Sequence, residues 1–404
     1  MIPRVVVTGV GCVSALGHDA ASTWEGIKSG RCGIAVATLF DTSAHRTHLA
    51  AQAWGFDPVA RAGRREAHRS SRADQLAVAA AEEALGDARF PSSARGGLAL
   101  VLGGGAGGMR DAERFHRALL GGDRRSARRG TRALTSHPPN ATTDFLARRF
   151  EIHGPRATIS TACSSSATAV GYAADLVRSG RVTAALCGGA EALCELTYAG
   201  FNSLRAVDPS PCRPFDARRA GLSLGECGAI LLLESAESAA LRGARVYAEV
   251  AGYAISADAH HMTAPDPLGA GAARAIRGAL HDAGLTPSDI DYVNAHGTGT
   301  PQNDAAETAA LHASLGARAA QIAVSSTKSQ VGHCLGAAGA IEAAVTVMAI
   351  RHGLLPATIG WESRDAACDL DYVPTAPRPA RIRAALSDSF AFGGNNTVLA
   401  FRAA

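Results

Sequence analysis

The stretch ATISTACSSSATAVGYAADLV, at residues 157–177, has the residue pattern of a strand followed at once by a helix. It opens on β-branched residues and continues from Cys163 as a run of small and apolar residues with no charge before Asp175. Such a run predicts a buried helix that begins near Cys163. A short strand joined directly to a buried helix is typical of an α/β protein.

The same alternation extends in both directions. Predicted strands at 4–9 and 98–102 flank a predicted helix near 71–86, and strands bounded by glycine follow at 182–190 and 227–234. The rhythm restarts after residue 245, with strands and helices in turn at 246–256, 269–284, 289–295, 304–315, 322–327 and 336–351. We therefore expect an α/β sandwich of two comparable halves, residues 1–245 and 246–404, in one compact unit without a low-complexity linker.

The composition narrows the class of protein. Of the 404 residues, 47% are apolar and 19% are charged, which indicates a globular chain with a large core. The 40 basic and 36 acidic residues leave a net charge of +4, which is too balanced to indicate nucleic-acid binding. Nine cysteines without a C-x-x-C pair predict free thiols and no metal site. Because neither a leader nor a membrane span is apparent, we expect a cytoplasmic protein.

The glycine-rich stretch LALVLGGGAGG, at residues 98–108, raises the alternative of a dinucleotide-binding fold. Gly103, Gly105 and Gly108 follow a predicted strand with G-x-G-x-x-G spacing. That fingerprint also needs an acidic residue at the end of a second strand, whereas Asp123 falls in the arginine-rich run GGDRRSARRG. Close backbone packing is therefore the preferred explanation of these glycines.

Cys163 is the candidate nucleophile. At the N-terminus of a helix, free amides and the helix dipole favour thiolate over thiol, so we expect a lowered pKa for Cys163. The alternative is a small buried hydrophobic residue, which is the usual role of a free cysteine and fits the other eight.

Two histidines of the second half lie at predicted strand ends, where polar residues gather with glycine. His296 belongs to NAHGTGTPQND and His333 to SSTKSQVGHCLGAAGAIEAAV, and either one alone would more often be a core residue. Lys328 is the natural partner of Glu342, because an unpaired carboxylate in that alanine-rich helix would be costly to bury. We expect the pair to orient the neighbouring histidine loop, unless both side chains reach water.

The segment DSFAFGGNNTVLAF, at residues 388–401, predicts a strand, a glycine turn and a second strand. Backbone N–H groups of such a turn can stabilise an oxyanion, with Phe390 and Phe392 as apolar walls. A hairpin that simply packs two aromatic rings into the core explains the segment equally well.

Four of these segments together resemble the signature blocks of the β-ketoacyl-[acyl carrier protein] synthases: TACSSS, HGTGTP, STKSQVGHCLGAAGAIE and FAFGGNN. The resemblance covers essentially the whole chain, through VVVTGVGCVSALG at 5–17, RPFDARRAGLSLGE at 213–226, SADAHHMTAP at 256–265 and CDLDYVP at 368–374. It is strongest to the stand-alone elongating synthases of type II fatty acid and polyketide systems. It implies a thiolase-like fold, a five-layer αβαβα sandwich of two related halves, that works as a dimer.

The resemblance implies a decarboxylative Claisen condensation that lengthens a fatty acid or polyketide chain by two carbons. Cys163 would carry the acyl chain as a thioester, while His296 and His333 would bind the malonyl thioester oxygen and promote loss of CO₂. The backbone amides of Cys163 and Phe392 would form the oxyanion hole. Lys328 with Glu342 would hold the His333 region in place.

The remaining site residues implied by the resemblance bind substrate. Thr298 and Thr300 would contact the phosphopantetheine arm, and Phe392 would gate the acyl pocket. Phe390 and Asn396 are further substrate-binding candidates from the same turn. Ala106 stands where related enzymes often have a larger aliphatic residue, so we expect a roomier pocket that admits long or rigid acyl chains.

The implied partner is an acidic acyl carrier protein, whose phosphopantetheine arm delivers the substrate, and no metal or redox cofactor is expected. The second subunit of the dimer would be another copy or a subunit like a chain-length factor. Two arginine clusters are candidates for docking the carrier protein, first Arg64, Arg65, Arg69 and Arg72, and second Arg128 and Arg129.

Three alternatives can be compared with this assignment. A thiolase has a similar histidine loop, but it needs a second cysteine as base, and FAFGGNN contains none. A non-catalytic partner subunit would lack the cysteine, whereas TACSSS retains Cys163. An initiating synthase would have a Cys-His-Asn set, whereas this chain has His at both 296 and 333.

Overall fold

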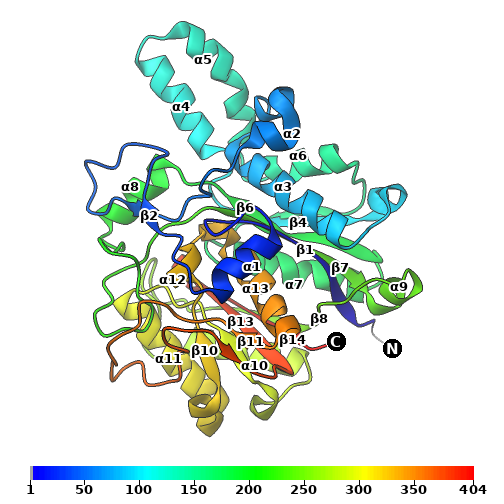
Figure 1. Cartoon of the computed structure of the whole chain (residues 1–404), viewed down its shortest axis with the longest axis vertical. Coiled ribbons are helices and arrows are strands. Elements are labelled where there is room, and N and C mark those ends of the chain that lie inside the picture. Colours follow the sequence, from blue (N-terminus) through cyan, green and yellow to red (C-terminus); the bar gives the residue numbers. More distant parts are fainter. Residues whose placement is uncertain (1–2) are drawn as a thin grey trace.

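The computed structural model describes residues 3–404, apart from the side chains at positions 62, 127, 129, 132 and 133. Ten strands form one mixed sheet that consists of two five-stranded halves (Figure 1). The strand order in the first half is β5 (Arg156–Ile159), β4 (Ala99–Gly103), β6 (Ala184–Glu191), β7 (Cys227–Ser235) and β1 (Val5–Val13). The order in the second is β10 (Ala323–Ser325), β9 (Tyr292–Asn294), β13 (Ala384–Ala391), β14 (Asn395–Arg402) and β8 (Ala248–Ala257).

The two halves repeat the same strand directions. In the first, β4 pairs in parallel with β5 and β6, and in the second, β9 pairs in parallel with β10 and β13. Two antiparallel pairings complete each half, through β7 and β1 or through β14 and β8. The ladder between β1 and β8 has two residue pairs, Val6 with Glu249 and Val7 with Ala248. The halves are thus joined by a short backbone seam.

Helices cover both halves and fill the space between them. The inner layer consists of α7 (Ser165–Arg178) and α13 (Ala338–His352), which pack on each other and on both sets of strands. The outer face of the first half carries α3 (Arg72–Asp87) and α6 (Ala141–Phe150), and that of the second carries α10 (Ala270–Asp282) and α11 (Pro301–Leu315). The layers therefore follow the predicted αβαβα order.

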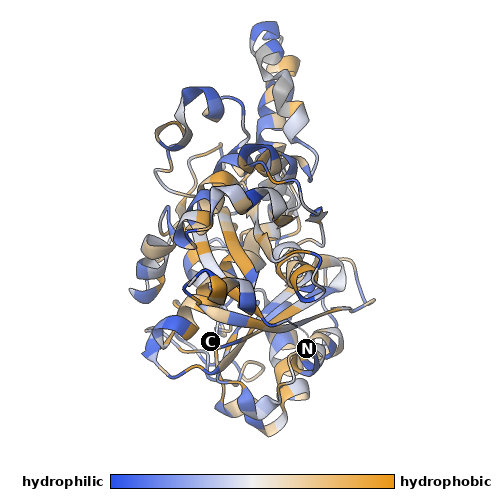
Figure 2. Cartoon of the chain, turned by 90° about the vertical axis from the view of Figure 1, so that its right-hand side faces the viewer, coloured by the Kyte–Doolittle hydropathy of each residue, from blue (hydrophilic) through white to orange (hydrophobic). Residues whose placement is uncertain are grey.

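The inner layer is packed by small side chains. All residues of α13 from Ala338 to Ile350 are buried, which explains the absence of charge along most of this segment. A Cβ on Gly339 would lie 2.6 Å from the Cβ of Ala167, so α13 and α7 approach as closely as glycine permits. In Figure 2 the central strands and the helices against them carry most of the hydrophobic colour.

The remaining elements are short or peripheral. They are α1 (Ala20–Lys28), α2 (Pro58–Ala67), α4 (Met109–Leu120), α5 (Arg124–Gly130), α8 (Glu195–Ser203), α9 (Ala236–Leu241), α12 (Lys328–Val331) and the strands β2 (Ala35–Val36), β3 (Leu49–Ala50), β11 (Leu354–Leu355) and β12 (Arg378–Pro379). The hairpin of α4 and α5 projects from the body of the molecule (Figure 1). Within residues 3–404, no helix combines the length and the apolar character that crossing a membrane requires.

The glycines after β4 serve packing, as expected. A Cβ on Gly103 would overlap the backbone of Ser165 and Ser166 on α7. A helix, α4, does open after Gly108, but Asp123 caps the N-terminus of α5 and ends no strand. The acidic residue that a dinucleotide-binding fold requires is therefore not in place.

Candidate active site

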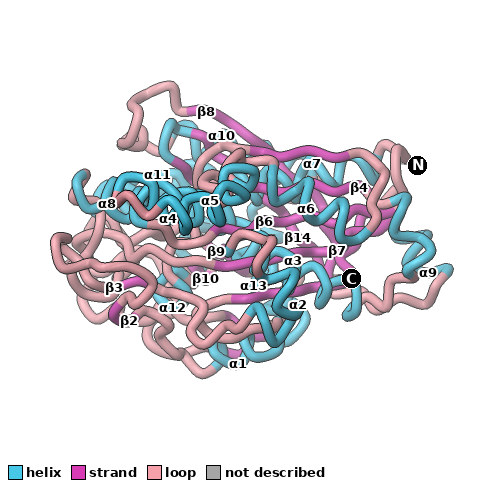
Figure 3. The backbone as a smooth tube through the Cα atoms, turned by 90° about the horizontal axis from the view of Figure 1, so that it is seen from above, coloured by secondary structure: helices cyan, strands magenta, loops and turns pink. Residues whose placement is uncertain are grey.

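A cavity of about 360 Å³ lies between the two halves, where β5, β9 and β13 end and the chain turns into loops. Such loops gather at one end of the sandwich, near α8 and α12 on the left of Figure 3. The cavity wall includes eight of the residues that the sequence singled out, namely Cys163, His296, Thr298, Thr300, His333, Phe390, Phe392 and Asn396. The other seven residues follow Cys163 by 133 positions or more in the sequence, and the fold brings them to the same site.

Cys163 lies in the turn between β5 and α7. Ala162, just before it, has a φ of 54°, a left-handed conformation that a non-glycine residue rarely adopts, and Cys163 itself is 6% exposed. The expectation of a lowered pKa was wrong. Burial raises the pKa of the Cys163 thiol to about 11, and the nearby Lys328 ammonium offsets the rise only in part. Desolvation of the thiolate therefore outweighs the helix N-terminus.

Two backbone amides act on the Cys163 sulfur. The N–H groups of Phe392 and Cys163 favour the charged form of Sγ and oppose the rise in the pKa of the thiol. Phe392 comes from the glycine turn between β13 and β14, where its ring stacks on Phe201 at 5.6 Å between centroids. An acyl group on Sγ would place its carbonyl oxygen close to the same two donors.

His296 is held from behind by charged side chains. Glu307, on α11, accepts the backbone N–H groups of His296 and Gly297, each at 2.7 Å. The Lys328 Nζ lies 3.2 Å from His296 Nδ1 and donates to the His296 carbonyl oxygen at 2.6 Å. Because an ammonium group can only donate, His296 Nδ1 is an acceptor and the ring proton is on Nε2.

His333 reaches the same tautomer by another route. The backbone N–H of Leu335 donates to His333 Nδ1 at 3.2 Å, so the proton again lies on Nε2. The two imidazole rings are 5.3 Å apart at an interplanar angle of 86°. Burial and the charge of Lys328 lower the pKa of both histidines well below the usual value. The cavity is therefore provided with two neutral N–H donors.

Lys328 and Glu342 form the ion pair that the sequence predicted. The Nζ of Lys328 donates to Glu342 Oε1, and each side chain is only 1% exposed. Burial raises the pKa of Glu342 to about 7, and the ammonium opposes the rise. The side chain of Lys328 also contacts His296, and the pair joins α12 to α13 on either side of the His333 loop, so its support of the His333 region stays a prediction.

Three further polar residues, Thr298, Thr300 and Asn396, line the cavity. Thr298 and Thr300 hydrogen bond to each other through their hydroxyl groups at 2.8 Å. Asn396 donates through Nδ2 to Asp258 Oδ1 at 2.7 Å, which ties the turn after β13 to the loop after β8. Ala106 differs from these residues. Its side chain is buried, it is not part of the cavity wall, and its N–H donates to Glu191 Oε1 at 2.8 Å.

The first arginine cluster divides into two groups. Arg64, Arg65 and Arg69 are exposed on or just after α2, so they are available to an acidic partner. Arg72 is not on the open surface, because its guanidinium forms two hydrogen bonds to Glu226, at 2.6 and 2.8 Å, and is 12% exposed. The structure thus gives Arg72 an internal ion pair.

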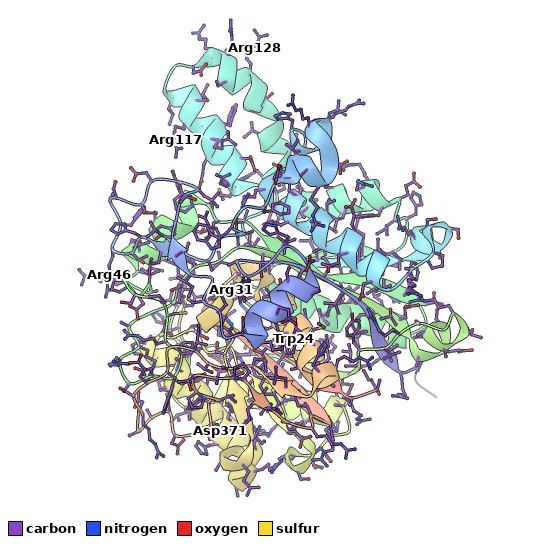
Figure 4. The ribbon with its side chains drawn as sticks, in the orientation of Figure 1. Trp24, Arg31, Arg46, Arg117, Arg128 and Asp371 are labelled. Carbon is purple, nitrogen blue, oxygen red and sulfur yellow. The ribbon has the colours of Figure 1, made fainter. Side chains whose placement is uncertain are left out.

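The second arginine cluster belongs to the projecting hairpin. Arg128 is exposed on α5, at the far end of the hairpin and away from the body of the molecule (Figure 4). The side chain of Arg129, on the same helix, lies outside the described part of the structure.

Several residues at the cavity escaped the sequence analysis. Arg205 and Asp258 line the wall, and Glu307 holds the His296 loop from outside it. Arg205 stands in a loop without a motif, whereas Asp258 belongs to SADAHHMTAP, a stretch to which the sequence analysis gave no site role. Glu307 had a local signal, since it follows HGTGTP within one helical turn of Asp304, and a carboxylate there can accept the loop amides.

The chemistry available at the site follows from these groups. Cys163 is the one cysteine among the described residues that line the cavity, so the second thiol of a thiolase is missing there. In the part of the chain that the structure describes, no group of three or more His, Cys, Asp or Glu side chains is arranged to hold a metal ion. The arrangement offers a nucleophile, an oxyanion hole and two neutral donors.

Comparison with known proteins covers the whole chain. Residues 3–239 match the family model of the β-ketoacyl synthase N-terminal domain, and residues 247–362 match that of the C-terminal domain. A curated relative, 3-oxoacyl-[acyl-carrier-protein] synthase 2 from Synechocystis sp., is 42% identical, with 99% of this chain and 98% of the relative covered.

Solved structures agree with this assignment. One is described as the ishigamide ketosynthase/chain length factor, with a TM-score of 0.95, 37% identity and full coverage of both chains. Another is a type II polyketide synthase acyl-carrier protein in complex with its ketosynthase bound to the hexaketide, with a TM-score of 0.88, 31% identity and full coverage of both chains. These likenesses confirm the predicted thiolase-like fold and the predicted enzyme class. The chain belongs to the β-ketoacyl synthase family.

Proposed function

We propose that the chain is an elongating 3-oxoacyl-[acyl-carrier-protein] synthase, which condenses an acyl thioester with malonyl thioester and releases CO₂. The observation that carries this proposal is the meeting of Cys163, His296 and His333 on one cavity wall. The thiol can hold the acyl group, and two neutral imidazoles can donate to an oxygen that becomes negative. Among the described residues, the wall contains no other cysteine and no other histidine.

The first half-reaction is acyl transfer to Cys163. The sulfur attacks the thioester carbonyl of the incoming chain, a new C–S bond forms, the old C–S bond breaks, and the carrier leaves with its thiol protonated. The amides of Cys163 and Phe392 stabilise the negative oxygen of the tetrahedral intermediate. The proton of the Cys163 thiol must depart, and burial makes this ionisation costly.

The second half-reaction makes the carbon nucleophile. The Nε2–H groups of His296 and His333 donate to the thioester oxygen of the malonyl group, the bond to the carboxylate breaks, and the electron pair forms an enolate. Both imidazoles are neutral, and each stabilises the negative oxygen by donating a hydrogen bond through its Nε2–H group. The enolate carbon then attacks the acyl carbonyl on Cys163, a C–C bond forms, and the C–S bond breaks to release the Cys163 thiolate.

We propose that an acyl carrier protein delivers both substrates on its phosphopantetheine arm, so that no resident cofactor takes part. Thr298 and Thr300 would bind the arm, with Asn396 and Phe390 beside the acyl group and Phe392 as its gate. The docking surface would consist of Arg64, Arg65, Arg69 and Arg128, which are exposed. The polyketide ketosynthase solved in complex with its carrier protein supports this assignment.

The oligomer, the division of the chain and its location are proposed on the same basis. We propose a dimer with a second copy or with a subunit like a chain length factor, since solved relatives include ketosynthases paired with chain length factors. A boundary at 245/246 falls between β7 and β8 and would separate a half with the thiol from a half with the histidines. Nine free cysteines support a reducing, cytoplasmic location.

The reaction can be tested with acyl carrier protein loaded with a medium-chain acyl group, together with malonyl carrier protein labelled with ¹³C at C2. We expect a 3-oxoacyl product that is two carbons longer and contains one ¹³C, and an acyl adduct on Cys163 by intact mass. Cys163→Ala is the matched control and should give neither. Absence of both signals from the wild-type chain, under conditions where a known synthase reacts, would favour a non-catalytic partner subunit.

A further inference from the structure

Glu191 is a buried carboxylate to which the proposed reaction gives no role. It ends β6 and is 1% exposed. It accepts the backbone N–H groups of Gly105 at 2.9 Å, Ala106 at 2.8 Å and Gly336 at 3.2 Å. Burial raises the pKa of Glu191, and these N–H groups oppose the rise. A carboxylate desolvated to this degree needs such partners, and they come from two separate loops.

The two loops come from different halves of the fold and meet at the carboxylate. Gly105 and Ala106 belong to the glycine-rich loop between β4 and α4, in the first half of the fold. Gly336 belongs to the turn that follows His333, in the second half. A Cβ on Gly336 would lie 2.6 Å from Glu191 Oε2 and 2.8 Å from the Cα of Gly104. The approach therefore requires glycine, and Glu191 joins the loops at their closest point.

The turn held by Glu191 also sets the ring of His333. Leu335 has a φ of 48°, which is sparsely populated for a non-glycine residue and must be maintained by its surroundings. Its N–H is the donor to His333 Nδ1, and the next N–H along the chain, that of Gly336, is the donor to Glu191. Glu191 Oε2 thus holds the N–H of Gly336, the residue after Leu335. Leu335 in turn holds the His333 ring through its own N–H.

We propose that Glu191 is a positioning residue for His333 and that it couples the glycine-rich loop at 104–107 to the histidine. This inference rests on the proposed function, because it assigns Glu191 to the decarboxylation half-reaction. Loss of the carboxylate frees the turn at Leu335, so His333 Nε2 no longer points steadily at the malonyl oxygen. Acyl transfer to Cys163 does not use His333 as a donor and is affected less.

Two substitutions separate the hydrogen bonds of Glu191 from its bulk. Glu191→Ala removes all three contacts. Glu191→Gln keeps the shape, and with its oxygen at the Oε2 position it still accepts from Gly105 and Gly336, while its NH₂ group faces the N–H of Ala106. Asp74→Asn is the matched control, because Asp74 is also a buried carboxylate that accepts a backbone N–H, from Ser71 on the outer helix α3.

The measurement is the ratio of two rate constants in single-turnover experiments on full-length protein. One is acylation of Cys163 by acyl carrier protein, followed by intact mass, and the other is decarboxylation of malonyl carrier protein by enzyme already acylated. For Glu191→Ala we expect the decarboxylation rate constant at saturating malonyl carrier protein to fall about tenfold to hundredfold, with acylation changed by less than about threefold. Glu191→Gln should lie between Glu191→Ala and wild type, and Asp74→Asn should keep the wild-type ratio.

The possible outcomes separate this inference from the proposed function. A wild-type ratio in Glu191→Ala, or an equal loss of both half-reactions, overturns the positioning role while the reaction itself stands. If the wild-type chain performs neither half-reaction, the proposed function fails first. If Glu191→Ala does not fold, Glu191→Gln decides by the same ratio, and a ratio equal to that of Asp74→Asn overturns the inference.

Discussion

The ammonium group of Lys328 lies against Nδ1 and the carbonyl oxygen of His296, and its counter-ion Glu342 approaches it from α13. Burial and, after it, this cation lower the pKa of the imidazole, and the ammonium leaves Nε2 as the hydrogen-bearing nitrogen. One buried ion pair therefore sets the tautomer of a histidine and helps to keep it neutral. The first prediction follows from this relationship.

Lys328→Ala should destabilise the protein and suppress decarboxylation. Removal of the ammonium leaves the Glu342 carboxylate buried without a partner, which costs about 3–5 kcal/mol in the free energy of unfolding. The double variant Lys328→Ala/Glu342→Ala removes both charges, so it should recover much of the stability in urea unfolding but none of the decarboxylation activity. Full recovery of activity in the double variant would show that the pair is only structural.

The reactivity of Cys163 should rise with pH across the whole working range. At pH 7, a thiol with a pKa of about 11 is ionised in about one molecule in 10,000. Because the pKa is raised, the thiolate fraction increases about tenfold per pH unit until the pH approaches that value. Alkylation by iodoacetamide, followed by intact mass between pH 6.5 and 9.5, should show no plateau. A plateau below pH 8 would restore the original expectation of a thiol activated by the helix N-terminus.

His333→Ala should separate the two half-reactions. We expect malonyl decarboxylation to fall by about a hundredfold, because one of two donors to the developing enolate is lost. Acylation of Cys163 should remain within about threefold of wild type, since its oxyanion hole consists of backbone amides. Single-turnover mass spectrometry measures both steps, and a parallel loss of the two would contradict the roles assigned here.

Charge reversal at Arg64, Arg65 and Arg69 should weaken carrier-protein docking without changing the chemistry. We expect the KM for acyl carrier protein to rise about tenfold, kcat to stay within about twofold, and the difference from wild type to shrink at high salt. Arg381→Glu is the control, as an exposed arginine of the second half. If acyl groups on a short pantetheine thioester show the same rise in KM, the arginines do not act on the carrier protein.

Ala106 lies outside the described cavity wall, so Ala106→Phe should shorten the accepted acyl chains only if a bound chain extends beyond that cavity to the glycine-rich loop. The side chain of Ala106 is buried on the glycine-rich loop, so a phenyl ring there must occupy space within the protein. Competition between acyl carrier proteins of graded chain length, read as adducts on Cys163, measures the preference. An unchanged preference in a folded variant would remove Ala106 from the acyl pocket.

The sequence was sufficient for the fold and for eight of the residues of the cavity wall. Alternating runs located all ten strands of the main sheet, and Cys163, His296 and His333 met as expected. Cys163 and His296 do follow strands, β5 and β9, but His333 follows the short helix α12, so its expected place at a strand end was wrong. The pairing of Lys328 with Glu342 followed from the cost of burying a lone charge.

The errors have a common physical origin. The pKa of Cys163 and the burial of Arg72 both depend on the side chains, distant in sequence, that surround these groups in the fold. A local sequence pattern does not show which distant residues will lie nearby in the fold. The α4–α5 hairpin was not predicted, although α4 carries apolar residues at helical spacing, at Met109, Ala112, Phe115 and Leu119.

The β1–β8 ladder is short, so the contact between α7 and α13 is important for the distance between the Cys163 sulfur and the His333 ring. Cys163 precedes α7, and His333 precedes α13, so any separation of these helices moves sulfur away from nitrogen as a rigid shift. The absence of a side chain at Gly339 thus sets the distance between the Cys163 sulfur and the His333 ring. Gly339→Ala would increase this distance and lower the reaction rate without altering any group that touches substrate.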